Sequence, residues 1–357
     1  MTDRPKRLRV WGIAAASLLA TVALAELLVR LLLPAEGLPA PAPPSTIDPY
    51  APNPYIVSRR PYLQMFLPGA RYRAQRPSYL VDYEINAHGL RGPEIDPKED
   101  RRLLIVGDSI PEGHGVPFEQ SFPPRLDRTL DDAGWSVTSG AMQGGSPLHY
   151  AANLPRYLEL DPDAVLLLLY ENDLWEDRRR EAEYFDLPPI EEDAGSRLWS
   201  LARRSMRPPA DSDLERHVRV NRDTKLPAVE PDPITPIVVA PEVFDQQWEM
   251  TAPYLDALAD GLEREDVPLL VAVFALGTLV PRAPDAHHAH ARTLEGKVRA
   301  WCDRRGVPFL SLYPVSERAF EGLAWEDIMI PEDGHPTAEM QRRLAAALEP
   351  WLRENLD

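Results

Sequence analysis

Cysteine is almost absent from this sequence, which holds one cysteine, Cys302, among its 357 residues. A single thiol cannot form a disulfide within the chain, and it excludes a zinc site built from several cysteines. The lack of disulfides does not by itself place the protein inside the cell, since many exported proteins have none.

Positive charge is also scarce, with 39 Lys and Arg against 56 Asp and Glu and a formal net charge of −17. Such a surface repels phosphate backbones, so nucleic acid is not an expected partner. Hydrophobic residues make up 44% of the chain, which suffices for a packed core and excludes a wholly disordered protein. The 39 prolines predict many loops and extended connections.

The N-terminus is basic and is followed by an apolar run from Val10 to Leu33, interrupted among strongly polar groups only by Glu26 and Arg30. These two residues are four apart, so they share one helix face and can pair. At about 1.5 Å per residue the run suits a membrane crossing, and the basic flank favours an orientation with the bulk of the chain across the membrane. We therefore predict a membrane anchor over residues 1–33.

A cleaved signal peptide is the alternative, because Ala23-Leu24-Ala25 matches the small-x-small cleavage pattern. Both readings place the rest of the chain outside the cytoplasm. Residues 34–78 follow as a linker and lead-in, rich in Pro and Ala over 34–60, which would hold the next domain away from the bilayer.

Strand and helix patterns alternate over residues 79–357, which predicts a parallel sheet covered on both faces. The expected strands are Tyr79–Ile85, followed by a turn at 86–89, then Arg102–Val106, Trp135–Thr138, Ala164–Tyr170, Val267–Leu276 and Val307–Leu312. The expected helices are Phe118–Ala133, Leu148–Leu160, Asp245–Arg264, Ala286–Arg305 and Pro336–Leu352. The charged, Pro-rich residues 174–240 are predicted to form an insertion or lid with one helical patch at Leu198–Met206.

Ser109 directly follows a buried strand, where reactive groups of parallel sheets gather. A serine hydroxyl needs a base, and an imidazole needs a carboxylate to fix its tautomer. His335 meets both needs, because Asp333 lies two residues before it and Glu332 three before it. Either carboxylate could reach the ring, so both are candidates for the acid. A Ser that caps the next turn and a solvated loop His are the structural alternatives.

Two further elements suit stabilisation of an oxyanion. Gly144 lies in a Gly-Gly loop after a strand, where backbone N–H groups are free to donate. Asn172 ends the most hydrophobic strand, and its amide could donate as well, although Gly-Gly and Asn also commonly close turns. The His287, His288 and His290 cluster lacks a metal-ligand spacing, so no metal site is predicted there. Asp108 is expected to hold the loop by hydrogen bonds, and Cys302 to pack in a helix.

In chain order these elements resemble the four blocks of the SGNH hydrolase superfamily, the GDSL-type esterases. The matching segments are Gly107-Asp108-Ser109, Gly144, Asn172-Asp173 and Asp333-Gly-His335-Pro336. The stretch Asn86-Ala-His-Gly-Leu-Arg91-Gly is similar to membrane-anchored bacterial members. The likeness covers roughly residues 80–355 without the 174–240 insertion. The sequence departs from the pattern at Ser139, where Asn is usual, at Tyr170, where Gly is common, and at Glu332, where Asp is usual.

The resemblance implies a flavodoxin-like three-layer α/β/α fold with a mostly parallel sheet, and ester hydrolysis without a cofactor. It implies Ser109 as nucleophile, His335 as base, and the Ser109 and Gly144 amides with the Asn172 side chain as oxyanion donors. Together with the anchor, it implies a domain facing the periplasm from the bacterial inner membrane.

The expected substrate is an O-acyl, above all O-acetyl, ester of envelope or exported polysaccharide, hydrolysed or passed to an acceptor. Trp175, Tyr184 and Trp199 could stack on sugar rings or form the core of the lid. A lipid esterase or lysophospholipase is the enzymatic alternative, and a non-catalytic glycan-binding envelope protein that keeps the fold is the other.

Overall fold

The structure is a computed structural model that describes residues 21, 56–58, 63–95, 101–184, 213–223, 239, 241–275, 285–319 and 321–356. The predicted anchor over 1–33, apart from Thr21, and the helical patch at Leu198–Met206 lie outside these residues. So does most of the predicted linker and much of the predicted insertion. Within the part of the chain described, no helix combines the length and the apolar character that a bilayer crossing requires.

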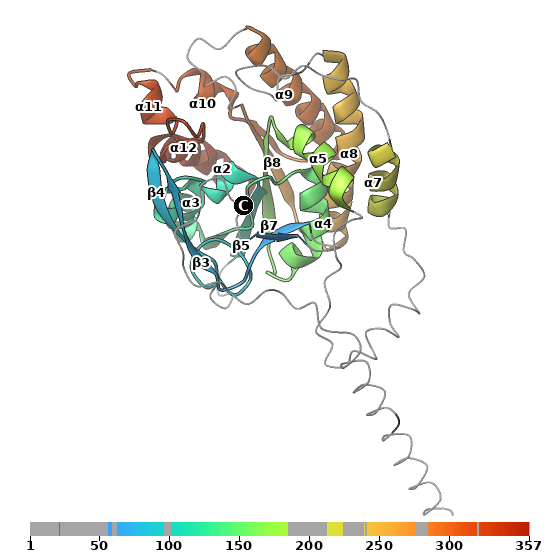
Figure 1. The fold of residues 1–357 in the computed structure, drawn as a ribbon, viewed down its shortest axis with the longest axis horizontal. Coiled ribbons are helices and arrows are strands. Elements are labelled where there is room, and N and C mark those ends of the chain that lie inside the picture. The colour runs from blue at the N-terminus through green and yellow to red at the C-terminus, as the bar shows by residue number, and fades with distance from the viewer. Residues whose placement is uncertain are drawn as a thin grey trace, which may run out of the picture. The chain divides into compact units, whose positions relative to one another are not determined.

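A five-stranded parallel sheet carries the fold (Figure 1). Its strands are β5 (Arg101–Gly107), β6 (Trp135–Ser139), β7 (Ala164–Tyr170), β8 (Leu269–Phe274) and β9 (Phe309–Ser311). They lie in the order β6-β5-β7-β8-β9. Counted from the first of them along the chain, this is 2-1-3-4-5, the flavodoxin-like order. The predicted parallel sheet is confirmed, and all seven residues of β7 are buried as its Val and Leu run indicates.

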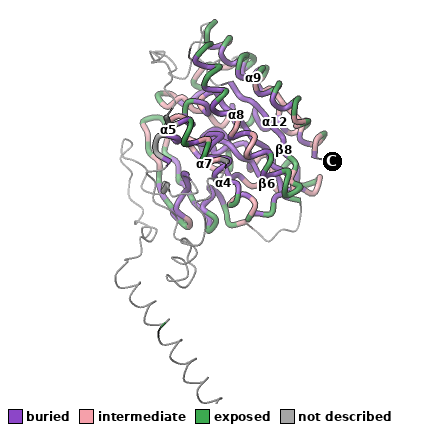
Figure 2. The backbone as a smooth tube through the Cα atoms, turned by 90° about the vertical axis from the view of Figure 1, so that its right-hand side faces the viewer, coloured by how far each residue is buried: buried purple, intermediate pink, exposed green. Residues whose placement is uncertain are grey.

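Helices cover both faces of the sheet and complete three layers. One face packs on α4 (Pro147–Leu158), α8 (Pro241–Arg264) and α9 (Asp285–Arg305), and the other on α3 (Phe122–Leu130) and α12 (Ala338–Asn355). Alternate strand residues point to opposite faces, so Leu167 joins the first core and Leu166 the second. Figure 2 shows the buried backbone running through the centre, with exposed residues on the outer side of α9.

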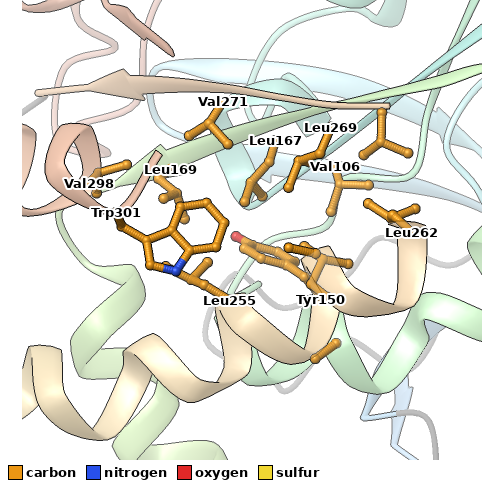
Figure 3. Close-up of a cluster of buried hydrophobic side chains, with 14 of the residues drawn as sticks. Val106, Tyr150, Leu167, Leu169, Leu255, Leu262, Leu269, Val271, Val298 and Trp301 are labelled. Atoms are coloured by element: carbon orange, nitrogen blue, oxygen red, sulfur yellow. The ribbon is translucent and has the colours of Figure 1, made fainter. Parts of the chain in front are cut away.

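The first core is closed by aromatic side chains from two helices. Figure 3 shows Trp301 of α9 and Tyr150 of α4 packed beneath Leu167, Leu169 and Val271 of the sheet. Both rings are fully buried, at 1% and 0% exposure. The indole N–H of Trp301 still finds a partner, because it donates to Asp256 Oδ1 of α8 at 2.9 Å.

The predicted helix over Phe118–Ala133 is wrong in its continuity. It divides into η1 (Phe118–Gln120), α3 and η2 (Asp131–Ala133), and Ser121 between the first two is extended. The cause is the pair Pro123 and Pro124, which lack the N–H groups needed to continue a preceding helix. Prolines fit the first turn of a helix, where those N–H groups have no partner, so α3 begins anew.

The charged segment after residue 172 holds two helices that its composition does not predict. They are α5 (Asp173–Glu183) and α7 (Asp213–Asp223). Polar contacts join them to α8, because Asn221 Nδ2 donates to Glu181 Oε1 at 2.8 Å and Tyr254 Oη donates to the same oxygen at 2.8 Å. Glu181 of α5 is thus buried and hydrogen-bonded, whereas a charged sequence is normally interpreted as a solvated one.

Two small antiparallel sheets precede the main one and were largely missed, since only β4 was predicted. They pair β1 (Ile56–Ser58) with β2 (Gln64–Phe66) and β3 (Arg71–Arg76) with β4 (Tyr79–Glu84). Tyr72 and Tyr83 stack across the hairpin with ring centroids 4.6 Å apart. The predicted turn at 86–89 is confirmed, because Asn86 Oδ1 accepts from the backbone N–H groups of His88 and Leu90, each at 3.0 Å.

Three short helices complete the described elements: α2 (Ser109–Glu112), α10 (Tyr313–Glu317) and α11 (Trp325–Ile328). Other predicted elements are present with ends that differ by a few residues. Strands β8 and β9 are shorter than the predicted strands Val267–Leu276 and Val307–Leu312. The ends of helices α8 and α12 differ from the predicted ends by up to four residues.

Candidate active site

Ser109 lies at the carboxyl end of the central strand β5, where the chain turns into α2. Gly107 permits this turn, since a Cβ there would lie 2.6 Å from Pro111 Cγ and 2.9 Å from the Leu168 carbonyl oxygen. Asp108 is fully buried and holds the loop as predicted, because its Oδ1 accepts from the Ile110 N–H at 3.1 Å. Its Oδ2 lies 3.3 Å from Ser109 Oγ. Burial raises the pKa of Asp108 to about 7.

His335 reaches Ser109 from a loop 226 residues further along the chain. Its Nε2 lies 2.9 Å from Ser109 Oγ. The loop is held on α11 and the start of α12, because the Ile330 N–H donates to the His335 carbonyl at 2.8 Å and the Thr337 N–H to the Ile328 carbonyl at 2.8 Å. The spatial meeting of the predicted alcohol and imidazole is therefore present in the fold.

Of the two candidate acids, Asp333 is the one that contacts the ring. Its Oδ1 lies 2.5 Å from His335 Nδ1, while Glu332 is exposed and has a left-handed backbone, with φ of 65°. Gly334 between acid and base is also left-handed, with φ of 81°. This tight turn lets a carboxylate only two residues away fold back on the imidazole.

The charges in this cluster shift its pKa values strongly. Burial alone would raise the pKa of Asp333, but the contact with His114 and the hydrogen bond with His335 outweigh burial and hold that pKa well below its usual range. Burial and the positive charge of His114 lower the pKa of His335, against the opposing effect of Asp333. At neutral pH the site therefore holds an ionised Asp333 and a neutral His335 whose Nε2 can accept a proton.

Gly144 lies in the loop after β6, and three hydrogen bonds hold the backbone of Gln143 and Gly144 in place. Gln64 Nε2 of β2 donates to the Gln143 carbonyl at 2.8 Å, Arg180 Nη2 of α5 donates to the Gly144 carbonyl at 2.9 Å, and the Gln143 N–H donates to Glu112 of α2. The Gln143 carbonyl and the Gly144 N–H belong to one peptide plane, so Gln64 also fixes the direction of that N–H.

The backbone conformation at position 144 favours glycine. Its φ is 66°, and a Cβ would lie 2.7 Å from Arg180 Nη2. The loop is held on the end of β5, because the Met142 N–H donates to the Gly107 carbonyl at 3.1 Å, and the end of β6 is held on α2, because Ser139 Oγ donates to the Pro111 carbonyl at 3.3 Å. Ser139, which stands where Asn is usual, thus contributes a hydrogen bond to this packing.

Asn172 lies just beyond β7, at the N-cap of α5, on the same edge of the sheet as Ser109. Its side chain makes no cap hydrogen bond, and its buried Oδ1 has no hydrogen-bond partner within the described residues. The neighbouring Asp173 is the one that closes the turn, since its Oδ2 accepts from the Tyr170 N–H at 3.1 Å. The amide of Asn172 is thus not committed to the local turn.

The histidines of α9 do not gather into one site. His288 Nδ1 lies 2.7 Å from Tyr313 Oη, and His290 packs its ring edge-on against Phe244. Among the described residues, ligand atoms that could surround a metal ion occur in His114, Asp333 and His335, all within 4.8 Å of one another. Both ring nitrogens of His335 are already engaged by Ser109 and Asp333, so the cluster serves better as a hydrogen-bonded relay. Cys302 is buried in α9, and burial raises its pKa to about 12.

Besides Gln64 and Arg180, the structure brings Tyr79, His114 and Glu112 to the site, and none of these residues was predicted. Tyr79 Oη, from the start of β4, lies 3.3 Å from Asp333 Oδ2 and 3.1 Å from His114 Nε2. Glu112 ends α2, which Ser109 begins, and His114 follows in the next loop; His114 Nδ1 and Glu112 Oε1 lie 3.8 Å apart. The nearness of His114 and Glu112 to Ser109 in the sequence could have indicated that they belong to the site. No local sequence pattern indicates that the hairpin of Tyr79 lies beside it.

The model of the GDSL-like lipase/acylhydrolase family matches residues 105–343 of this chain, which is well over half of it. The protein belongs to this family. Among curated proteins, an arylesterase of Vibrio mimicus is 37% identical over 75 residues. That match covers 20% of this GDSL-family chain and spans only 38% of the relative's length.

Solved structures with a similar fold include TesA, which is 18% identical to this GDSL-family protein, with 71% of this chain and 99% of that one covered and a TM-score of 0.42. The acetyl xylan esterase AlAXEase is 11% identical, with 70% and 99% covered and a TM-score of 0.42. The family membership rests on the match over residues 105–343, and it supports an esterase or acylhydrolase.

Proposed function

We propose that this protein is a serine esterase that transfers an acyl group through Ser109. One observation carries the proposal, namely the continuous contact from Ser109 Oγ to His335 Nε2 and from His335 Nδ1 to Asp333. His335 takes the hydroxyl proton while Ser109 Oγ bonds to the ester carbonyl carbon, and the carbonyl oxygen becomes an oxyanion. The ionised Asp333 stabilises the imidazolium that forms.

The oxyanion is held by the backbone N–H groups of Ser109 and Gly144 and by the Asn172 amide. When the intermediate collapses, the alcohol leaves with the proton from His335 and the acyl group stays on Ser109. Water, or an acceptor sugar hydroxyl, then gives its proton to His335 and attacks the acyl carbon. This second step releases the acid or the new ester and restores the serine.

The proposed substrate is an O-acetyl ester of envelope or exported polysaccharide, met outside the cytoplasm by a domain tethered through residues 1–33. The apolar run and its basic flank support this location. Trp175, in the first turn of α5, is 43% exposed and follows Asn172 by three residues, so it suits stacking on a sugar ring. Tyr184, by contrast, is 1% exposed and belongs to the core.

The test measures turnover of p-nitrophenyl esters of increasing acyl length by the full-length protein, with Ser109→Ala beside it. We expect Ser109→Ala to abolish turnover, and full activity in that variant would refute the assignment. Preference for acetyl supports the glycan substrate, whereas preference for long chains would contradict it and favour a lipid esterase. Labelling of Ser109 by a fluorophosphonate probe requires an activated nucleophile, so a wild-type protein that takes no label would instead be a non-catalytic binding protein.

A further inference from the structure

A second histidine, His114, lies against the base of the proposed triad. The ring centroids of His114 and His335 are 4.3 Å apart, and the His114 side chain is 15% exposed. It comes from the loop that follows α2, five residues after Ser109. Asp333 contacts both rings, because its Oδ1 lies 2.5 Å from His335 Nδ1 and its Oδ2 lies 3.8 Å from His114 Nε2.

The hydrogen bonds around His114 determine where its protons are. Tyr79 Oη donates to Asp333 Oδ2 at 3.3 Å, which uses the single proton of the phenol. The same oxygen lies 3.1 Å from His114 Nε2, so that nitrogen must be the donor of this contact. His114 therefore carries a proton on Nε2.

The other nitrogen of His114 faces a buried acid. Its Nδ1 lies 3.8 Å from Glu112 Oε1, and neither atom has another hydrogen-bond partner within the described residues. The Glu112 side chain is 1% exposed, so a lone pair on Nδ1 would meet a carboxylate with little solvent to screen the repulsion. A proton on Nδ1 turns this contact into an attraction, and His114 is then an imidazolium.

The other charged groups near His114 come from neighbouring elements. Arg91 donates to the backbone carbonyls of Glu112 and Gly113, which holds the loop, and Arg76 of β3 interacts with Tyr79. Glu112 of α2 and Asp333 are the acids that face His114 directly. With these two acids against one imidazolium, a positive His114 is the favourable state of the cluster.

We propose that His114 is a positioning residue, whose imidazolium anchors Asp333 through Tyr79 and keeps the neighbouring His335 unprotonated and ready to act as base. The inference rests on the proposed function and deepens it. The charge of His114 disfavours a second cation 4.3 Å away, so His335 stays neutral to lower pH than it otherwise would. The same charge holds the carboxylate that orients His335.

The pKa directions agree with this geometry. Burial would lower the pKa of His114, but its close contacts with the acids Asp333 and Glu112 raise it to about 9. The pKa of His335 is lowered by burial and next by the charge of His114. His335 therefore remains an unprotonated base at lower pH than a histidine without these neighbours would.

The experiment follows the rate of fluorophosphonate labelling of Ser109 against pH in the full-length protein. This rate reports proton removal by His335 and does not depend on the identity of the substrate. The variants are His114→Gln, which keeps a donor for Tyr79 without the charge, His114→Lys, which restores a charge, and His88→Gln as control. His88 is exposed in the turn at 86–89. Thermal unfolding confirms that each variant is folded.

We expect the midpoint of the acid limb to rise by about one pH unit in His114→Gln, which is about tenfold slower labelling on that limb. His114→Lys and His88→Gln should keep the wild-type midpoint. A midpoint unchanged in His114→Gln, or raised equally in His114→Lys, would overturn the role of the charge. Absence of labelling in the wild type at every pH would instead contradict the proposed nucleophile, so the two failures are distinguishable.

Discussion

The carboxylate of Asp333 contacts two imidazoles, and this favours Asp333 over Glu332 as the acid of the proposed site. A neighbouring carboxylate cannot replace it, because Glu332 is exposed on the outer side of the turn formed with Gly334. The motif thus places its acid two residues before His335, although three is the spacing that the family resemblance implied. The turn is possible because residues 332 and 334 both adopt left-handed backbone conformations.

Replacing the acid therefore gives a matched pair of variants. Asp333→Asn removes the charge that orients His335 and stabilises its cation, and we expect kcat for a p-nitrophenyl ester to fall by about 10⁴-fold. Glu332→Gln removes the same kind of charge one residue away and should leave kcat within about twofold, because an exposed charge is screened by solvent. Steady-state kinetics on both variants checks the pair, and a comparable loss in Glu332→Gln would reassign the acid.

Asn172 offers a second test at the scale of one residue. Its side chain makes no cap hydrogen bond with α5, so Asn172→Ala should leave the melting temperature nearly unchanged. Loss of one oxyanion donor costs about 2.7–4 kcal/mol in the barrier, so we expect kcat to fall by roughly 10²–10³-fold. Activity measured beside thermal unfolding separates the two effects. Loss of stability with little loss of kcat would mean that Asn172 is structural.

At the scale of elements, the loop that carries Gly144 is held by strands and helices that precede and follow it in the chain. Gln64 of β2 links Arg180 of α5 to the Gln143 carbonyl, and β2 is itself anchored because its Gln64 carbonyl lies 2.8 Å from His149 Nε2 of α4. The small lead-in sheets thus complete the site, although the four family blocks contain none of their residues.

This linkage predicts that Gln64→Leu impairs catalysis without touching the reacting groups. The Gly144 N–H loses its fixed direction, so we expect kcat to fall by about tenfold or more, with KM little changed, a smaller effect than loss of a whole donor. Gln75→Leu makes the same substitution at an exposed position of β3 and serves as control. Equal kinetics in the two variants would show that the clamp has no catalytic effect.

At the scale of the whole molecule, buried titratable groups make stability depend on pH. Burial raises the pKa of Asp108 to about 7 and of Asp177 to about 8, and its acidic neighbours raise the pKa of His114 to about 9. The folded state holds these protons at pH values where the unfolded chain has lost them. Their stabilisation is complete below the unfolded pKa and is lost as pH rises through the folded one.

We therefore expect the melting temperature to fall between pH 6.5 and pH 9. Buried His149 and His290, with pKa values lowered to about 3 and about 4, act in the opposite sense only below about pH 6.5. Asp177→Asn removes one of the titrating groups and should flatten the fall. Differential scanning fluorimetry across this range checks both statements, and a melting temperature that rises toward pH 9 would contradict them.

Much of the site followed from local patterns. Ser109, Gly144, Asn172 and His335 each lie beyond a buried strand or before the last helix, so their place at one edge of a parallel sheet could be predicted from the strand pattern. Helix α5 could not be predicted in this way, because its burial depends on partners such as Asn221 that lie about forty residues away in the sequence. The anchor over residues 1–33 stays a prediction, because apart from Thr21 it lies outside the described residues.

The sequence by itself determined the parallel sheet, because strand and helix patterns alternate and apolar runs such as Ala164–Tyr170 must be buried on both faces. It also determined the order of the candidate site residues along the chain. Only the tertiary structure decided between Asp333 and Glu332, and it brought Tyr79, His114 and Gln64 to the site. The physical reason is that the hydrophobic periodicity that predicts strands and helices is a property of residues close together in the sequence. A hydrogen bond between segments more than two hundred residues apart depends on where the backbone turns, and no local pattern encodes that.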